Sequence, residues 1–297
     1  MKILIIGLGI GQVYKEQCLL RGYQVVTVDN KLPADYNDLK DCFMDHIFFN
    51  LALICTPNYL HEIMIHMVAP YSNIVLVEKP GLKTLRQWKK ICGQYPKKII
   101  MVKNNIYRKQ LCDLKNIFHK NFKNIDEMRL NWNSINRIPH PGYWFTNKKE
   151  SFGGVSYDLG PHLINMLQVI LKGGISDYFM SGSREQLHCM NDITSTQYGK
   201  INRQNPVYDV DDVCLMKFNY KDVNILVELC WKTKNKTKDE QNIEIFFKEG
   251  GKLIYEFGLC PNSMYGEMIN DVLANLNYDF HYNLDCDTLK IITELIR

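Results

Sequence analysis

The sequence predicts an α/β fold in two parts, an N-terminal part of alternating strands and helices and a C-terminal α+β part. In the first part, nearly continuous apolar runs typical of interior parallel strands alternate with helical patterns. From Met128 onward strand patterns dominate. A chain of 297 residues with 46% hydrophobic residues can fill two cores. We therefore predict domains at residues 1–120 and 121–297.

The first predicted strand leads into a glycine-rich turn. It is followed by a helical pattern and by a second strand that ends at Asp29, about twenty residues after the turn. This order is typical of a Rossmann unit, in which helix N-terminal amides face a pyrophosphate and the acid bonds a ribose hydroxyl. The residues predicted to contact a dinucleotide here are Gly7, Leu8, Gly9, Ile10, Gly11 and Asp29.

The turn departs from the usual fingerprint, because Gln12 stands where the third glycine is expected. Either the turn is one residue shorter and Gly11 packs the helix on the strand, or Gln12 sits at a looser crossing. A nucleotide-free, flavodoxin-like unit is the alternative. Asp29 favours NAD over NADP because it would repel a 2′-phosphate, whereas Lys31 would soften this discrimination and keeps NADP as a second candidate.

Two further interior strands end in polar residues. One ends at Thr56-Pro57, and the next at Glu78-Lys79-Pro80. Ligands of open α/β sheets bind beyond the carboxyl ends of the strands, so these residues are candidates for chemistry. Pro80 has a fixed φ and can form a cis bond, which would hold Lys79 in one direction. The alternative is a solvated strand end.

The segment GGVSYDLGPH, residues 153–162, places Asp158 and His162 four residues apart at the start of a predicted amphipathic helix. At this spacing both side chains emerge on one helix face and can converge on a small molecule. The Gly153-Gly154 pair would allow a tight turn, and the apolar run that follows would anchor the helix in a core. The alternative is a helix with a half-buried structural histidine.

Taken in order, these motifs resemble those of the Gfo/Idh/MocA oxidoreductase family. The resemblance rests on the glycine turn, on Thr56-Pro57-Asn58 with His61, on Glu78-Lys79-Pro80, and on the Asp158 to His162 segment. It covers nearly the whole chain and implies a Rossmann domain followed by an α+β domain with an open, mostly antiparallel sheet. Residues 31–50 are too short for the helix, strand and helix usual in the family, so we expect a shortened Rossmann domain.

The resemblance implies NAD(P)-dependent hydride transfer to or from a hydroxyl-bearing carbon of a sugar, nucleotide sugar or cyclitol. His162 suits general acid–base catalysis near neutral pH, Lys79 can stabilise charge on the reacting oxygen, and Asp158 can orient hydroxyls or the imidazole. Which of Lys79 and His162 moves the proton stays open. Further expected cofactor contacts are Thr56, Pro57, Asn58, His61, Glu78, Lys79 and Asn105. Expected substrate contacts are Lys79, Arg108, Trp144, Asp158 and His162, with a core aromatic as the alternative for Trp144.

Two other functions fit parts of the pattern. A noncatalytic dinucleotide sensor would keep the glycine turn but would need neither Lys79 nor His162, so their presence favours an enzyme. A biliverdin-reductase-like enzyme would reduce an unsaturated or imine compound on a similar fold. The Asp158/His162 pair argues against that reaction.

Composition limits the partners and the location. A net charge of +4 with scattered basic residues disfavours nucleic acid, and the lysine-rich residues 232–238 are interpreted as a solvated loop. The ten cysteines form no Cys-x-x-Cys and the eight histidines no paired metal spacing, so we expect free thiols and no metal. We expect no membrane partner and a cytoplasmic protein. The resemblance implies a homo-oligomer, a dimer or tetramer, formed through the C-terminal sheet.

Overall fold

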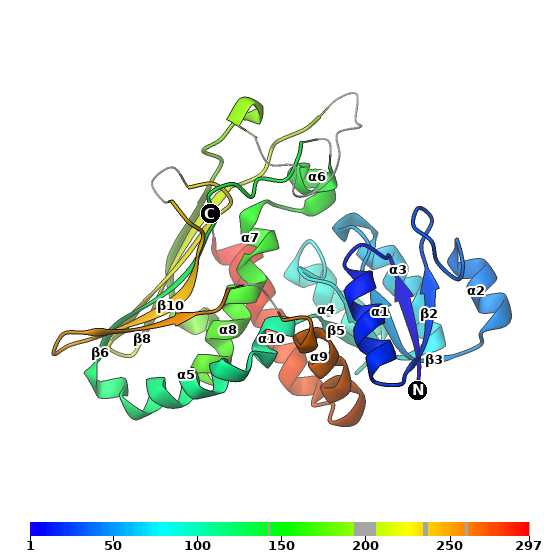
Figure 1. Cartoon of the computed structure of the whole chain (residues 1–297), viewed down its shortest axis with the longest axis horizontal. Coiled ribbons are helices and arrows are strands. Elements are labelled where there is room, and N and C mark those ends of the chain that lie inside the picture. The colour runs from blue at the N-terminus through cyan, green and yellow to red at the C-terminus, as the bar shows by residue number, and fades with distance from the viewer. Residues whose placement is uncertain (142, 193–205, 234–236, 259–260, 297) are drawn as a thin grey trace. The chain divides into compact units, whose positions relative to one another are not determined.

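The computed structural model describes residues 1–141, 143–192, 206–233, 237–258 and 261–296 (Figure 1). The chain divides into two compact units, and each is described by itself. Unit 1 comprises Met1–Tyr107 and Pro261–Cys286, and unit 2 comprises Arg108–Cys260 and Asp287–Arg297.

This division corrects the predicted domains at 1–120 and 121–297. Helix α5 (Lys109–Lys120) belongs to unit 2, where it packs against α8 (Gly160–Leu171). Near its end the chain returns to unit 1, because α9 (Ser263–Ala274) buries Met268 and Ile269 in the core that also holds β1 and α1. An amphipathic helix shows that it needs a core, but its sequence does not show which core it joins.

Unit 1 is built on a parallel sheet with the strand order β2-β1-β3-β4-β5. Its strands are β1 (Lys2–Ile6), β2 (Gln24–Val28), β3 (Phe49–Ile54), β4 (Ser72–Val77) and β5 (Ile99–Met101). Its other helices are α1 (Gly11–Leu20), α2 (Leu39–Asp45), α3 (His61–Val68) and α4 (Leu85–Gln94). Since β1, β3 and β4 are neighbours, Gly7, Thr56 and Glu78 follow adjoining strand ends, as the sequence predicted.

The segment between Asp29 and β3 confirms the shortened Rossmann domain. It contains only the seven-residue helix α2 and a single β-bridge from Val28 to Tyr36. The Asp38 carboxylate caps this helix by accepting a hydrogen bond from the Asp41 amide.

A buried ion pair that the sequence did not reveal holds α10 (Tyr278–Lys290) against the last strand of unit 1. The Lys103 ammonium contacts the Asp285 carboxylate, which also accepts a hydrogen bond from the Met101 amide at 3.0 Å. Neither side chain has more than 1% of its surface exposed. Burial raises the pKa of Asp285 to about 6 and lowers the pKa of Lys103, because both charged forms lose hydration. Removing one partner would leave the other charge buried without a counter-ion. The ion pair therefore favours this one placement of α10 against unit 1.

Unit 2 contains a six-stranded sheet with the order β11-β10-β6-β9-β8-β7. Only β6 and β9 run parallel to each other, which confirms a mostly antiparallel sheet. Its strands are β6 (Ile125–Asn133), β7 (Phe179–Glu185), β8 (Val213–Tyr220), β9 (Val223–Cys230), β10 (Glu240–Phe247) and β11 (Lys252–Glu256). Helices α7 (Val155–Asp158) and α8 lie along one face of this sheet (Figure 1).

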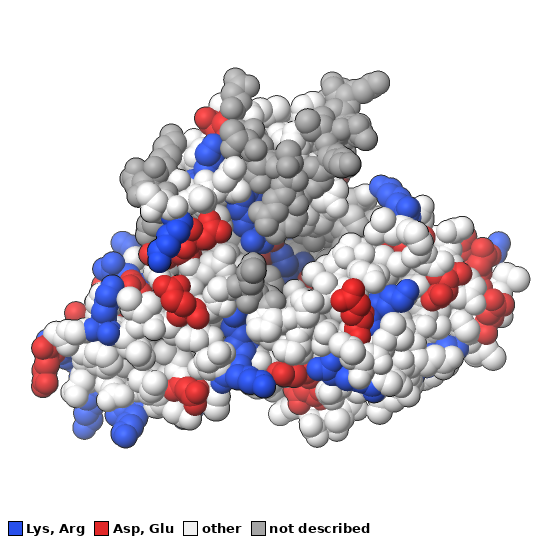
Figure 2. Space-filling model, viewed as in Figure 1, with Lys and Arg blue, Asp and Glu red and all other residues white. Residues whose placement is uncertain are grey.

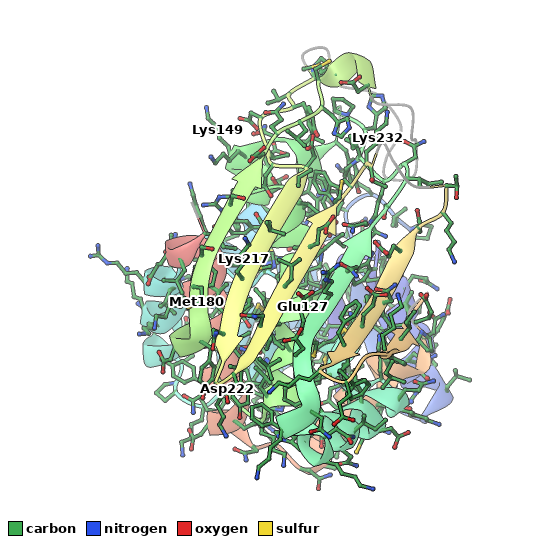
Figure 3. The ribbon with its side chains drawn as sticks, turned by 90° about the vertical axis from the view of Figure 1, so that its left-hand side faces the viewer. Glu127, Lys149, Met180, Lys217, Asp222 and Lys232 are labelled. Atoms are coloured by element: carbon green, nitrogen blue, oxygen red, sulfur yellow. The ribbon has the colours of Figure 1, made fainter. Side chains whose placement is uncertain are left out.

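Among the described residues, no helix covers the opposite face of this sheet, which is largely polar. In Figure 3 the strands lie in front of the helices, and Glu127 and Lys217 lie on the strands that face the viewer. The Asn131 amide donates to the Asn242 side chain at 2.9 Å, and the Asn133 amide donates to two glutamates. Such a face is open to a second copy of the chain, and the homo-oligomer stays a prediction.

Other features bear on partners. On the face drawn in Figure 2, Lys and Arg side chains lie among Asp and Glu side chains. Within the described ranges, the structure has no helix long and apolar enough to cross a bilayer, no cluster of metal-ligating side chains, and only free cysteines. Of the lysine-rich residues 232–238, residues 234–236 lie outside the described part of the chain.

Candidate functional site

The three glycines of the N-terminal turn have three different roles. Gly7 has φ +87°, and a Cβ there would lie 2.8 Å from the Cys55 carbonyl oxygen, so only glycine fits. A Cβ on Gly11 would lie 3.1 Å from Ile5 Cγ2, which assigns the close helix–strand contact to Gly11. A Cβ on Gly9 would meet no described atom within 4 Å. The structure therefore decides for the shorter turn.

The open position at Gly9 suits an anionic ligand. Helix α1 begins at Gly11, and the first amides of a helix have no acceptor within that helix. These amides and the helix dipole attract anions such as a pyrophosphate. Leu8 contributes differently, since its amide donates to the Asp29 carboxylate at 2.6 Å and thereby fixes the turn.

Asp29 is held by the backbone around it. Its carboxylate also accepts hydrogen bonds from the Lys31 and Leu32 amides, at 2.7 and 2.9 Å. Partial burial pushes the pKa of Asp29 upward, but the three amide hydrogen bonds outweigh it and leave the pKa lowered. A carboxylate with a lowered pKa is negatively charged at neutral pH. It stabilises the fold above its unfolded pKa, and this contribution is lost as the pH falls through the lowered folded pKa.

His61 was predicted to contact the cofactor, and the structure corrects this. The ring has no exposed surface, and its two nitrogens face the Gly81 and Thr56 carbonyl oxygens at 2.7 and 3.0 Å. Burial lowers the pKa of His61 to about 4 despite these two acceptors. The histidine therefore joins the loops after β3 and β4 and has no surface left for a ligand.

Glu78 fixes the backbone at Lys79. One carboxylate oxygen accepts a hydrogen bond from the Tyr14 hydroxyl at 2.7 Å, and the other accepts one from the Lys79 amide at 3.1 Å. The Lys79–Pro80 peptide bond is cis, as the sequence allowed. Lys79 is half-buried directly after this anchored carboxylate.

The remaining predicted cofactor contacts lie at the same edge of the unit 1 sheet. Thr56 and Pro57 are half-buried, and the Thr56 hydroxyl is buried without a hydrogen-bond partner in the described part of the chain. Asn58 and Asn105 are buried, and the Asn105 amide donates to the Asn104 side chain at 3.3 Å. Contacts of these residues with a cofactor stay predictions.

In unit 2, Asp158 and His162 do not share one helix, which corrects the predicted single helix. Asp158 ends α7, and His162 lies in the first turn of α8 after the intervening Leu159. Every residue in the range 153–168 is buried except these two, which are partly exposed. An acid and a histidine are thus the polar side chains that an otherwise buried segment presents.

The glycine pair before Asp158 is needed because other groups pack closely against its Cα atoms. A left-handed backbone is not the reason, since neither glycine has a positive φ. A Cβ on Gly154 would lie 1.7 Å from the Asp211 carbonyl oxygen, and a Cβ on Gly153 would lie 2.3 Å from the Tyr157 ring. The Asp211 carboxylate accepts hydrogen bonds from the Gly154 and Ser156 amides at 2.9 and 2.8 Å. Asp211, which the sequence analysis missed, therefore caps α7.

Replacing Asp211 with alanine should lower the free energy of unfolding by about 1–3 kcal/mol, because two buried amides lose their acceptor. Chemical denaturation would measure this loss. Asp209→Ala is the matched control, since Asp209 is exposed and accepts a single hydrogen bond from the Lys148 amide. Equal stability of the two variants would contradict the capping role.

Two tryptophans that the sequence analysis did not assign contact the Asp158/His162 pair. The Trp231 indole N–H donates to the Asp158 carboxylate at 3.1 Å. The Trp132 ring lies 5.7 Å from the His162 ring, centroid to centroid, with 32° between the planes. The sequence feature that could have indicated these two residues is a tryptophan at or just after the end of a strand pattern.

The two other predicted substrate contacts differ from expectation. Arg108 is 5% exposed, and its guanidinium donates to the carbonyl oxygens of Phe257 and Gly258, so it braces the chain after β11 instead of lining an open surface. Trp144 is half-buried and stacks on Phe145 with a centroid distance of 3.9 Å. Its contact with a substrate stays a prediction.

Known proteins share this architecture. Residues 125–251 match the profile described as the GFO/IDH/MocA C-terminal domain. GenD2 from gentamicin A biosynthesis, solved in complex with NAD, superposes with a TM-score of 0.74 at 15% identity, over 98% of this chain and 92% of that one. Over residues 125–251 the chain is therefore similar to the C-terminal domain of Gfo/Idh/MocA oxidoreductases, and the solved structures share its fold. WlbA dehydrogenase from Bordetella pertussis, in complex with NADH and UDP-GlcNAcA, has the same fold with a TM-score of 0.74 at 14% identity, over 99% and 94% of the chains.

A sequence relative of this chain is the putative UDP-kanosamine synthase oxidoreductase subunit of Amycolatopsis mediterranei (strain S699). It is 26% identical over 124 residues. The match covers 41% of this chain and spans about a third of the relative's length, 34%.

Proposed function

We propose that this chain is an NAD-dependent oxidoreductase that transfers a hydride between nicotinamide and a hydroxyl-bearing carbon of a sugar, nucleotide sugar or cyclitol. The observation that carries the proposal is the selective exposure of Asp158 and His162 within the buried range 153–168. Each hydroxyl of a polyol needs a hydrogen-bond partner when it is desolvated, and this pair offers both an acceptor and a titratable group. Two similar proteins support this substrate class: the WlbA dehydrogenase that binds UDP-GlcNAcA and the putative UDP-kanosamine synthase oxidoreductase subunit.

The residues of unit 1 fit the dinucleotide. The open position at Gly9, the amides at the start of α1 and the ionised Asp29 carboxylate match a pyrophosphate and a ribose diol. When bound, NAD supplies the hydride acceptor of the reaction. The chain's own task is to hold the substrate and to move one proton.

We assign the proton to His162 and the developing charge to Lys79. As the carbinol carbon is oxidised, an imidazole nitrogen of His162 takes the hydroxyl proton, and in the reverse direction it returns it. The Lys79 ammonium donates a hydrogen bond to the reacting oxygen and stabilises negative charge on it. Asp158 accepts a hydrogen bond from a substrate hydroxyl. Exchange of the proton roles of Lys79 and His162 is the alternative within this mechanism.

A turnover screen tests the proposal. The protein is mixed with NAD+ and, separately, with simple sugars, UDP-sugars and inositols, and nicotinamide absorbance is followed. We expect reduction of NAD+ with at least one member of these classes. Thermal stabilisation by NAD+ without turnover on any of them would instead favour the noncatalytic sensor. Oxidation of NADH by an unsaturated or imine compound alone would favour the biliverdin-reductase-like alternative.

We expect NAD to bind more tightly than NADP. The anchored Asp29 carboxylate would repel a 2′-phosphate by on the order of 1 to 3 kcal/mol, which corresponds to about 5- to 150-fold in affinity. Calorimetric titration of both cofactors measures the ratio. Lys31→Ala should increase the ratio of NAD to NADP affinity, because the Lys31 ammonium, two residues after Asp29 in the sequence, would offset the repulsion of the 2′-phosphate. Tighter binding of NADPH than of NADH would reject this assignment.

A further inference from the structure

The parallel strand pair of unit 2 presents two tryptophans to the helices that carry Asp158 and His162. In the register of β6 and β9, Trp132 lies opposite Leu229, and Trp231 follows two residues after Leu229. Trp231 lies directly after the end of β9, and its hydrogen bond to Asp158, together with the contact between Trp132 and His162, places both indoles on the side of the sheet where these helices lie. Both are buried, with 5% and 0% of their surfaces exposed.

The two indoles make different contacts. Trp231 uses its N–H, and because an indole N–H can only donate, this hydrogen bond orients the Asp158 carboxylate as an acceptor. The Trp132 N–H is buried without a partner among the described residues, so this ring meets its neighbours through its faces and edges. Those neighbours include His162, Phe257 at 5.4 Å, and the Arg137 guanidinium at 5.8 Å from the ring centroid.

We propose that Trp132 and Trp231 are positioning residues that orient His162 and Asp158 for proton transfer and hydroxyl binding. Each of the two partly exposed side chains is backed by one rigid, buried ring that cannot ionise. Such a ring holds the rotamer of the side chain that it supports. Because the indole does not ionise, the ring adds no second titratable group beside that side chain. The value of this orientation for catalysis rests on the proposed function, whereas the contacts themselves do not.

Labelling with 5-fluorotryptophan tests the contacts without substrate or cofactor. The chain has four tryptophans, so the ¹⁹F spectrum should show four resonances, assigned by single Trp→Phe variants or by Trp→Tyr where Phe does not fold. We expect the Trp132 resonance to move with pH through the range of imidazole ionisation, and to stop moving in His162→Gln. We expect the Trp231 resonance to move in Asp158→Ala.

Controls separate the neighbouring charges. Asp158→Ala should leave the pH response of Trp132 in place, and Arg137→Gln should offset its resonance without removing the response. The resonance of Trp88, a fully buried tryptophan on α4, should be unchanged in every unit 2 variant. A pH response of Trp132 that survives in His162→Gln, or a Trp231 resonance unmoved in Asp158→Ala, would overturn the proposal.

Kinetics test the consequence. We expect Trp132→Phe and Trp231→Phe to lower kcat by about tenfold to a hundredfold, as small misplacements of reacting groups do, with an unchanged Kd for NAD. Unchanged kcat in both variants would overturn the positioning role and leave NAD-dependent turnover, and with it the proposed function, intact. If the Trp132 and Trp231 resonances respond to His162 and Asp158 as expected but the wild-type chain shows no turnover, the result would count against the proposed function alone.

Discussion

His162→Ala should lose about a hundredfold to ten-thousandfold in kcat, because removal of a general acid–base group leaves the hydroxyl proton without an acceptor. The fold should persist, since His162 is one of the two partly exposed side chains in a buried segment. Affinity for NAD should be unchanged, because the residues that fit the dinucleotide belong to unit 1. Steady-state kinetics on the protein's own substrate and calorimetric titration of NAD would measure both quantities.

The matched control is Val169→Ala, a change on the same helix at another partly exposed position. It should leave kcat unchanged. Lys79→Ala should also lose most turnover, and Lys83→Ala, a change at an exposed residue four positions further along the chain, serves as its control. Turnover at the wild-type level in His162→Ala would end the catalytic assignment of this histidine.

Gly9→Val should weaken NAD binding by roughly a hundredfold, because a β-branched side chain would fill the space in which the backbone approaches the pyrophosphate. The structure adds that the fold should tolerate the change, since a Cβ on Gly9 meets no described atom within 4 Å. Calorimetric titration with NAD and a thermal melt without it would separate binding from folding.

Two neighbouring positions give the controls for this prediction. Gln12→Ala should change neither quantity, because Gln12 is exposed on the first turn of α1. Gly7→Ala should instead destabilise the fold, since its Cβ would meet the Cys55 carbonyl oxygen at 2.8 Å. Unchanged NAD affinity in a folded Gly9→Val protein would mean that the N-terminal turn is not the pyrophosphate cradle.

The sequence predicted the local elements of the fold well. Apolar runs ending in glycines, in Thr56-Pro57 and in Glu78-Lys79 gave the parallel strands and the edge at which they end. The short segment after Asp29 gave the shortened Rossmann domain. These features depend on periodicity and on neighbouring residues, which a sequence displays directly.

Assignments that depend on distant residues were less successful. His61 occupies a typical motif position in the sequence but lies buried between two carbonyl oxygens. The Arg108 guanidinium donates a hydrogen bond to a backbone carbonyl oxygen after β11. Asp211 was missed because its partners, Gly154 and Ser156, are more than fifty residues away in the chain. Whether a polar side chain is open to a ligand depends on which groups fold against it.

The sequence by itself determined the two-part α/β plan, the glycine turn with Asp29, and the pairing of an acid with a histidine at residues 158 and 162. Only the tertiary structure decided that Gly11 packs the helix, that Asp158 and His162 lie on successive helices, and that Trp231 and Trp132 contact them. It also decided that α9 returns to unit 1. Local spacing and hydrophobic period are encoded within a few residues, whereas packing joins residues that only the folded chain brings together.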